Sequence, residues 1–395
     1  MRDVFIIGSK GIPARYGGFE TFVENLTKGQ QSQEIRYHVA CMEETEREFE
    51  YNGAHCFSIK PLPIGPARAV CYDLAAFHRC LQQIRRDRCQ DPVVYVLACR
   101  IGPFTGYLKR KLKKLGGTLY VNPDGHEFMR AKWNRAIRAY WRFSERLMVK
   151  HADQMICDSR NMERYIREEY QKYHPATTFI AYGTNVKDDC HENTKMQEWL
   201  QKNNLQKDEY YLVVGRFVPE NNYETMIREF MASDTRRNLV LITNVEENDF
   251  YRKLKEETHF DTDPRIRCVG TVYDQELLLK IRENAYGYFH GHEVGGTNPS
   301  LLEALGATKW NLLLDVGFNR EVGEDGALYW TKESGSLRSL LRQVDEMDDT
   351  QRSQLADQAR ERMNRCYSWP FIVEQYEKLF LDTQQDKPHQ RGGNV

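Results

Sequence analysis

The sequence predicts an α/β protein made of two doubly wound, Rossmann-like domains that face each other across a cleft. Short apolar runs alternate with helical patterns along both halves of the 395-residue chain, which is typical of parallel sheets covered by helices. The first strand of each half ends in a glycine turn that leads into a helix, at Gly17-Gly18 and at Gly215. A chain of this length also accommodates two domains.

The domain limits follow from a polar stretch at residues 186–209, which we interpret as the connection between the halves. The first domain then spans residues 1–185, and the second spans residues 186–366. A final amphipathic helix is expected at 367–381. Residues 382–395, rich in Gln, Gly and charge, have the composition of a disordered tail.

Composition narrows the class of function. Hydrophobic residues make up 41% and charged residues 29% of the chain, which is ordinary for a soluble protein. The net charge of −1 gives no general attraction to nucleic acid. The ten cysteines lack metal-type spacing and no signal-peptide pattern opens the chain, so we expect reduced cytoplasmic thiols and no metal. No apolar run is long enough to span a bilayer, so any membrane contact would be peripheral.

The chain opens with a predicted strand, turn and helix at residues 4–26. Gly17 and Gly18 lie at the start of the helix, where they would let the backbone approach a diphosphate or a sugar. Arg15, Tyr16 and Glu20 would then line the cleft. The alternative is a tight strand-to-helix loop with a surface Arg and Glu. The glycine spacing differs from the G-x-G-x-x-G dinucleotide fingerprint, which argues against a dehydrogenase.

A second loop with candidate site residues follows the predicted strand at 118–121. Residues just past the carboxyl end of a parallel strand usually face the ligand crevice, so Asp124, His126 and Glu127 are site candidates. For His126, a loop histidine bonded to backbone is the alternative. The other strands predicted in this half are 37–41, 54–59, 93–98, 154–157 and 178–182, and the helices are 70–85, 104–115, 131–150 and 160–170.

The predicted helix at 131–150 is strongly amphipathic, with apolar and aromatic residues on one side and basic residues on the other. Such a helix can lie on an anionic membrane or clamp phosphates. The alternative is a helix packed on the sheet with a solvated basic face. With the basic cluster of the preceding helix, the candidates for contact with phospholipid or an acceptor diphosphate are Lys109, Arg110, Lys111, Arg135, Arg138 and Arg142.

The second half repeats the alternation of strand and helix. Arg216 stands at the end of its first strand, where a guanidinium can grip a diphosphate in bidentate fashion. A surface ion pair with Glu220 is the alternative. The predicted strands are 210–214, 239–243, 266–269, 286–290 and 311–315, with helices at 223–231 and from 336 onward.

The stretch at 290–305 leaves a strand, turns through two glycines and enters a helix. Asn298 suits the N-cap, and Pro299 suits the first helical position. A helix N-terminus behind two glycines attracts phosphate through its free N–H groups and its dipole. Glu303, one turn inside, is better placed for a pair of sugar hydroxyls. The alternative is a capped turn with a solvated Glu.

Four segments together resemble the GT-B glycosyltransferases of family 4, and most closely the bacterial β1,4-rhamnosyltransferases of capsule and rhamnose-rich cell-wall polysaccharide synthesis. They are GSKGIPARYGGFETFVE at 8–24, NPDGHE at 122–127, VGRFVPENN at 214–222 and GHEVGGTNPSLLEAL at 291–305. The resemblance covers nearly the whole chain.

The resemblance implies a retaining, metal-independent rhamnosyltransferase without a cofactor, bound peripherally to the inner face of the plasma membrane. Its donor would be dTDP-β-L-rhamnose, and its acceptor a sugar on undecaprenyl diphosphate. Arg216 would neutralise the diphosphate, Glu303 would hold the ribose, and the helix at 367–381 would cross back to the first domain. Further donor contacts would come from Arg15, Gly17, Gly18 and His126, and from the backbone of Gly295, Gly296, Thr297 and Asn298.

Two positions depart from the family pattern. Many members place Lys five residues after the conserved Arg, where this chain has Asn221. Members also usually carry a Glu eight residues before the ribose-binding Glu, where this chain has Gly295. The candidates for catalytic proton transfer are Asp124, His126, Glu20 and Glu293.

Other functions are compatible with the same residues. A nucleotide-sugar epimerase or phosphorylase would share the architecture but act on a soluble substrate. A glycosyltransferase with a different donor sugar and an inactive nucleotide-sugar-binding scaffold are further alternatives.

Overall fold

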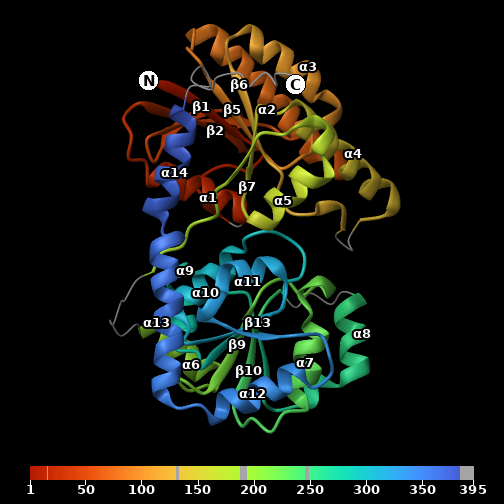
Figure 1. Ribbon diagram of the computed structural model, residues 1–395, viewed down its shortest axis with the longest axis vertical. Coiled ribbons are helices and arrows are strands. Elements are labelled where there is room, and N and C mark those ends of the chain that lie inside the picture. Colours follow the sequence, from red (N-terminus) through yellow and green to blue (C-terminus); the bar gives the residue numbers. More distant parts are fainter. Residues whose placement is uncertain (16, 130–132, 187–193, 245–248, 383–395) are drawn as a thin grey trace, which may run out of the picture.

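Two largely parallel sheets, one in each half of the chain, organise the molecule (Figure 1). The computed structural model describes residues 1–15, 17–129, 133–186, 194–244 and 249–382. Most of the strands are runs of apolar residues, because helices cover both faces of each sheet and leave little room for alternation. The predicted α/β fold with two doubly wound domains is confirmed.

The first domain has an eight-stranded sheet in the order β3-β4-β2-β1-β5-β6-β7-β8, in which the β3–β4 pair is antiparallel. Its strands are β1 (Arg2–Ile7), β2 (Ile35–Met42), β3 (Glu48–Tyr51), β4 (Ala54–Ile59), β5 (Val93–Leu97), β6 (Thr118–Asn122), β7 (Gln154–Cys157) and β8 (Thr177–Phe179). Its helices are α1 (Gly18–Lys28), α2 (Arg68–Asp87), α3 (Gly102–Lys114), α4 (Arg135–His151) and α5 (Arg160–Glu169), with single 3₁₀ turns at Gly65–Ala67, Glu127–Met129 and Gln171–Tyr173.

The second domain has a six-stranded parallel sheet in the order β11-β10-β9-β12-β13-β14. Its strands are β9 (Tyr210–Val214), β10 (Asn238–Ile242), β11 (Ile266–Gly270), β12 (Gly287–His290), β13 (Trp310–Leu314) and β14 (Leu328–Trp330). Its helices are α6 (Thr194–Lys202), α7 (Tyr223–Met231), α8 (Asp249–Thr258), α9 (Gln275–Glu283), α10 (Pro299–Ala307), α11 (Gly317–Gly323) and α12 (Ser336–Glu346), with 3₁₀ turns at Pro219–Asn221, Phe260–Thr262 and Glu324–Gly326.

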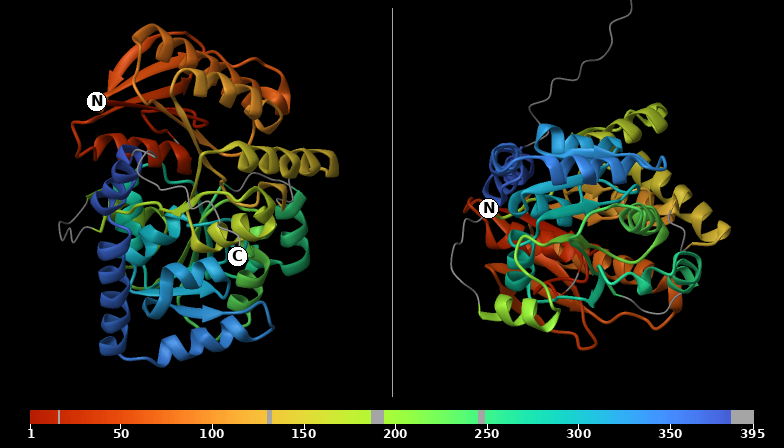
Figure 2. Two further views of the ribbon diagram at one scale, coloured as in Figure 1. Left: turned by 45° about the horizontal axis from the view of Figure 1, so that its top comes forward. Right: turned by 90° about the horizontal axis from the view of Figure 1, so that it is seen from below.

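The last two helices, α13 (Asp349–Cys366) and α14 (Trp369–Leu381), run along one side of both domains (Figures 1 and 2). Tyr376 and Phe380 of α14 are fully buried against the first sheet. The Tyr376 hydroxyl lies 3.3 Å from that of Tyr95 in β5, and the Phe380 ring lies 5.8 Å from the Tyr95 ring. Helix α14 is therefore part of the core of the first domain.

Some local predictions differ from the structure. Residues 194–202 of the supposed connection form α6, whose Met196 and Trp199 are buried in the core of the second domain beside Tyr210. The prediction that these residues only connect the domains is wrong. Most residues of α6 are polar, so its two buried apolar residues gave no clear helical pattern. The strand expected at 178–182 ends at Phe179, and β3, α8, α9 and β14 were not predicted.

Several predictions fall on residues that the structure does not describe. They are the tail at 383–395, the middle of the connection at 187–193 and the start of the basic helix at 130–132. In the described part, α4 begins after Asn134, whose side chain accepts the N–H of Ile137 at 3.0 Å. None of the helices described here combines the length and apolar character that crossing a membrane requires.

Candidate functional site

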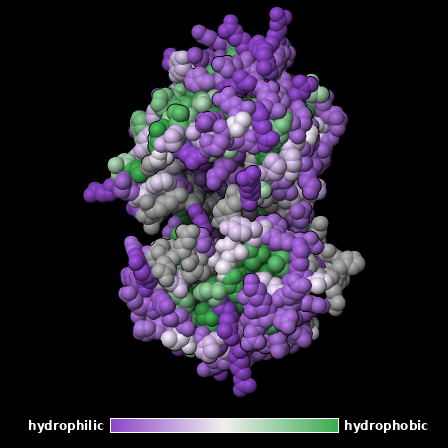
Figure 3. All heavy atoms as spheres, turned by 180° about the vertical axis from the view of Figure 1, so that it is seen from behind, coloured by the Kyte–Doolittle hydropathy of each residue, from purple (hydrophilic) through white to green (hydrophobic). Residues whose placement is uncertain are grey.

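The carboxyl ends of the two sheets meet where the domains face each other, and Figure 3 shows a furrow between the domains on one face. The contact is close enough that only glycine fits at two points. A Cβ on Gly125 would lie 2.8 Å from the Cα of Gly295. A Cβ on Gly296 would lie 2.0 Å from a carboxylate oxygen of Asp158. The predicted loops at 122–127 and 290–305 are therefore brought together from opposite domains.

The second domain contributes the loop that leads into α10. Asn298 is its N-cap and accepts the N–H of Ser300 at 2.9 Å, and Pro299 opens the helix, as predicted. Thr297 is buried and donates its hydroxyl to the backbone oxygen of Asp158. Gly295 has a φ of +139°, which a side-chain-bearing residue rarely adopts. A residue with a side chain at position 295 would therefore be strained in this backbone conformation.

Asp158, just past the end of β7, was not predicted as a site residue. Its side chain is buried at the domain contact, and its Oδ1 atom has no hydrogen-bond partner among the described residues. Burial raises the pKa of the Asp158 carboxyl well above its ordinary value, and the neighbouring Asp124 and Glu321 carboxylates raise that pKa further. The Asp158 carboxyl that faces Gly296 therefore holds its proton to a higher pH than an ordinary aspartate does.

Glu303 lies one turn into α10, and its carboxylate is about one-third exposed. One of its oxygens lies 2.7 Å from the guanidinium of Arg282, a residue of α9 that is almost fully buried. The same guanidinium nitrogen of Arg282 donates to the hydroxyl of Ser300 at 3.1 Å. Arg282 is a second residue that the sequence prediction missed.

Arg216 follows β9 and presents an exposed side chain at the end of the strand. Asn221, which stands where the family often has Lys, is buried and donates its amide to the backbone oxygen of Arg216 at 2.8 Å. Asn221 therefore holds the shape of the loop and supplies no positive charge. Arg216 is the cation that the sequence predicted here.

Glu293, a catalytic candidate, is engaged within its own domain. Its carboxylate accepts the side-chain amide of Asn222 at 2.9 Å and forms an ion pair with Lys332. Asn222 also donates to the backbone oxygen of Gly291 at 2.8 Å. These contacts tie the loop after β12 to the loops after β9 and β14.

The glycine loop after β1 is braced by carboxylates of α1. Glu20 is buried and accepts the N–H of Lys10 at 2.7 Å, and Glu24 accepts the N–H of Ala14 at 2.6 Å. Gly17 has a φ of +133°, and a Cβ there would lie 1.9 Å from Glu20. The Glu20 carboxylate is thus occupied in holding the loop.

The neighbours of that glycine loop differ in their exposure. Gly18 faces Pro299 of the opposite domain, 4.0 Å from where its Cβ would stand. Arg15 is exposed. Tyr16 lies outside the described residues.

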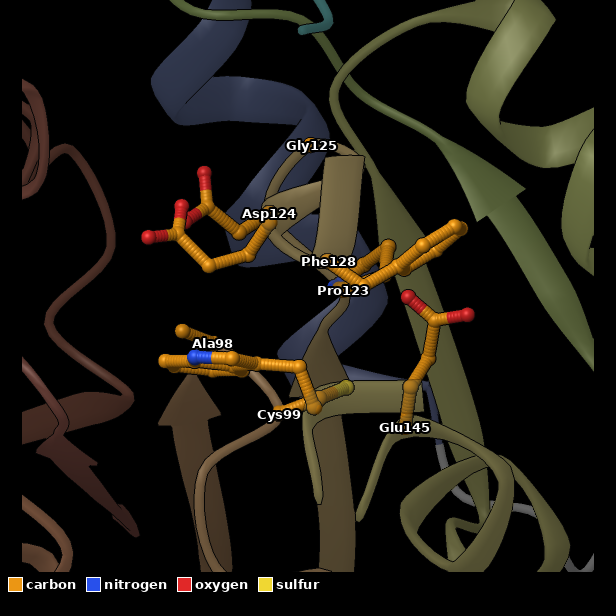
Figure 4. Close-up of a pocket in the computed structure, with 9 residues that line it drawn as sticks. Ala98, Cys99, Pro123, Asp124, Gly125, Phe128 and Glu145 are labelled. Carbon is orange, nitrogen blue, oxygen red and sulfur yellow. The ribbon is translucent and has the colours of Figure 1, made fainter. Parts of the chain in front are cut away.

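Asp124 and Glu145 lie on opposite sides of a small pocket behind the strand ends (Figure 4). Asp124 has a φ of +61°, and its N–H donates to the side chain of Asn122 at 2.7 Å. Glu145 accepts the hydroxyl groups of Tyr165 and Tyr170 at 2.7 and 2.5 Å. Burial raises the pKa of the Glu145 carboxyl.

His126 and Glu127 follow Asp124 in the same loop. The His126 ring packs edge-on against Tyr165, with 4.4 Å between the ring centroids. Burial lowers the pKa of His126 below its ordinary value, so its ring is neutral at pH 7. Glu127 accepts the indole N–H of Trp133 at 2.8 Å. A neutral His126 offers one donor and one acceptor rather than a charge.

The predicted basic residues divide into two groups. Lys109 pairs with Asp153 at 2.5 Å, and Arg142 pairs with Glu169 at 2.8 Å. Arg138 is half-buried. The exposed cations that remain on α3 and α4 include Arg110, Lys111, Arg135, Arg146 and Lys150.

Metal ligands do not gather in the described ranges: no group of three or more His, Cys, Asp or Glu side chains there could hold an ion. The loops at the strand ends offer the N-terminus of α10, two exposed arginines (Arg15 and Arg216), a paired Glu and several carboxyl groups.

Solved structures of other proteins share this arrangement. Sucrose-phosphate synthase from Thermosynechococcus elongatus has a TM-score of 0.75 at 16% identity, over 96% of this chain and 98% of that one. HepE from Anabaena in complex with UDP has a TM-score of 0.68 at 13% identity, over 96% and 99%. A glycosyltransferase from Rickettsia africae has a TM-score of 0.72 at 10% identity, over 96% and 97%.

These likenesses and the two facing sheets show that the chain has the GT-B fold. In sequence, residues 1–185 match a family described as a domain of unknown function, DUF1972. The comparison with curated proteins gives no match.

Proposed function

We propose that the protein is a glycosyltransferase that takes its donor from a nucleoside diphosphate sugar. The observation that carries the proposal is the contact of the loop before α10 with the first domain, at Gly295, Gly296 and Thr297. This loop presents a helix N-terminus, which favours phosphate. The HepE structure that shares the fold was determined in complex with UDP, which supports a nucleotide ligand for this protein.

The donor contacts divide between charge and sugar recognition. Arg216 and the N-terminus of α10 neutralise the diphosphate, and a guanidinium can do so with two parallel hydrogen bonds. Glu303 accepts a hydroxyl of the pentose. Asp124 is the preferred candidate for proton transfer, because it stands in the loop after β6 that meets the loop before α10. Asp124 is followed by Gly125, which lies against Gly295 in the loop before α10.

The specific donor in this proposal is dTDP-β-L-rhamnose, transferred with retention to a sugar on undecaprenyl diphosphate. The resemblance of the four sequence segments to rhamnosyltransferases supports the choice. With a β donor and retention, the product linkage is β.

The acceptor side of the proposal is the inner membrane face. Phe104, Tyr107 and Phe143 are large apolar side chains exposed on α3 and α4. Lys111 lies over the Tyr107 ring at 4.5 Å, and Arg146 lies over the Phe143 ring at 5.3 Å. Exposed rings beside cations suit an anionic bilayer, where rings enter the interface and cations meet headgroups. Figure 3 shows exposed hydrophobic residues among hydrophilic ones on the first domain.

A transfer assay tests the function. The protein is incubated with dTDP-rhamnose and with synthetic lipid diphosphates that carry glucose or N-acetylglucosamine, and the products are weighed by mass spectrometry. We expect a gain of one deoxyhexose on one acceptor. No transfer to either acceptor would reject the rhamnosyltransferase proposal.

Two further arms separate the alternatives. Transfer from UDP-glucose alone would keep the glycosyltransferase class and reject rhamnose as the donor sugar. Conversion of the donor without any acceptor would indicate an epimerase. Binding of the donor without turnover of any kind would indicate a scaffold.

A further inference from the structure

We propose that His292 is a second side-chain ligand for the diphosphate of the donor, beside Arg216. The inference rests on the proposed function, because it concerns the phosphate groups of the same nucleoside diphosphate sugar. His292 was not predicted as a site residue from the sequence. Its role follows from where its ring lies, next to Gly215 and Asn221.

The side chains at the end of β9 provide little charge for a diphosphate. Each phosphate group of a nucleoside diphosphate sugar carries a negative charge, and Arg216 is a single cation. Asn221 is an uncharged side chain at the position where the sequence departs from the family pattern, and its amide donates to the backbone oxygen of Arg216 at 2.8 Å. The N-terminus of α10 adds only a partial positive charge. A further hydrogen-bond donor beside Gly215 would therefore strengthen the binding of phosphate.

The ring of His292 lies at that place. A Cβ on Gly215 would be 3.1 Å from the Cε1 atom and 3.5 Å from the Nε2 atom of His292, and 3.5 Å from the Nδ2 atom of Asn221. The edge of the ring that carries Nε2 and the amide of Asn221 are thus on the same side of Gly215. Gly215 and His292 are both partly exposed, so solvent reaches this point.

His292 is held in position from several sides. Its backbone oxygen accepts the side-chain amide of Asn319 at 3.1 Å, and the N–H of the next residue, Glu293, donates to the backbone oxygen of Glu220 at 3.1 Å. The His292 ring stacks on that of His290, with 4.4 Å between the ring centroids and 13° between the planes. His290 is 1% exposed and gives the upper ring a fixed base. A ligand group that is already positioned loses little conformational entropy on binding.

The two stacked rings have different chemical roles. Burial lowers the pKa of His290 well below its ordinary value, and the neighbouring His292 lowers that pKa further, so the His290 ring is neutral at pH 7. His290 therefore supports the stack without adding charge. His292 is the partly exposed member of the pair, and an imidazole presents an N–H in its neutral form as well as in its charged form. A hydrogen bond from this N–H to a phosphate oxygen has a charged acceptor and is stronger than a bond between neutral groups.

Calorimetric titration of dTDP into three proteins tests the inference. We expect His292→Ala to raise the Kd of dTDP about tenfold or more, because a hydrogen bond to a charged group is lost. His292→Lys places a cation at the same position and should keep the Kd within about threefold of the intact protein. His78→Ala, at an exposed position on α2, is the control and should leave the Kd unchanged. Equal affinity of folded His292→Ala and the intact protein would overturn the inference. An equal loss in His292→Ala and His292→Lys would also overturn it, because His292 would then act only on the shape of the loop.

A protection experiment on the intact protein gives a test that needs no variant. Diethyl pyrocarbonate modifies accessible imidazole rings, and peptide mass mapping reports each histidine separately. We expect dTDP to slow the modification of His292 at least about fivefold, as expected of a site that is mostly occupied, and to leave His78 unchanged. A dTDP complex in which His292 reacts as fast as in the free protein would reject this inference alone. Failure of dTDP to bind the intact protein would reject the proposed function together with it.

Discussion

Asp158 is a carboxyl group whose surroundings raise its pKa. It is buried between the domains, with Asp124 and Glu321 close enough to raise its pKa further. An unfolded Asp titrates near pH 3.9. As the pH rises above about 4, the unfolded chain releases this proton while the folded chain keeps it. Asp158 therefore makes the folded protein less stable toward neutral pH than it is near pH 4.

The substitution Asp158→Asn should remove this pH dependence. An uncharged amide has no proton to lose, so the variant should gain stability relative to the intact protein as the pH rises. The gain is about 1.4 kcal/mol for each pH unit over which the folded carboxyl keeps a proton that the unfolded carboxyl has lost. Urea unfolding at pH 5 and pH 8 measures the difference. Asp234→Asn, at an exposed position, is the control. An identical pH dependence in Asp158→Asn and the intact protein would show that Asp158 is ionised in the fold.

The sequence could predict site residues only where chain position alone gives the location. Asp124 and His126 follow β6, and the strand-end rule applies to them directly. Asp158 likewise follows the end of a strand, β7. The next residue, Ser159, caps α5 by accepting the N–H of Met162, so Asp158 and Ser159 together have the pattern of a helix start. Arg282 is separated from Glu303 by 21 positions, and their contact depends on how α9 packs against α10.

At the scale of elements, prediction succeeded where several local signals agreed. The helix α10 was predicted with its N-cap and its first proline, because both act within one turn. The short helix α6 was missed, since only Met196 and Trp199 anchor it in an otherwise polar stretch. The contact of α14 with the first sheet joins Tyr95 to Tyr376, and no local pattern could show it.

The proposed membrane contact of α3 and α4 can be tested with charge-reversal variants. The double variant Lys111→Glu with Arg146→Glu reverses two cations that lie on exposed rings. Each basic residue near an anionic surface contributes about 1 kcal/mol, so the partition coefficient onto phosphatidylglycerol vesicles should fall at least about tenfold.

Vesicle co-sedimentation measures this loss. The matched control is the double variant Lys253→Glu with Arg342→Glu, which reverses two charges on the second domain. These side chains are 70% and 81% exposed. The control should bind vesicles like the intact protein. Equal sedimentation of both variants would remove the membrane role of α3 and α4.

At the scale of the whole molecule, the proposed transfer requires the two domains to meet closely. Gly296→Ala would place a methyl group 2.0 Å from Asp158 Oδ1 and 2.6 Å from its Cγ, so the domains must separate or shift. Overpacking of this kind costs about 1–3 kcal/mol, and we expect the transfer rate to fall about tenfold or more. Small-angle scattering should show a larger radius of gyration.

Gly306→Ala provides the matched control within α10. Its Cβ would be 3.4 Å from Val186, an ordinary contact, and alanine in a helix is favoured by about 0.5–1 kcal/mol over glycine. This variant should keep the transfer rate and the radius of gyration. A Gly296→Ala variant as active as Gly306→Ala would show that the close contact is not needed for transfer.

The central claim is that a nucleoside diphosphate binds between the domains with its pentose on Glu303. Calorimetric titration of dTDP into the intact protein, Glu303→Ala and the exposed control Glu346→Ala tests it most directly. Loss of a hydrogen bond to a charged group should raise the Kd of Glu303→Ala about tenfold or more, with a smaller rise for Glu303→Gln and none for the control. Equal affinity of folded Glu303→Ala and the intact protein would contradict the account.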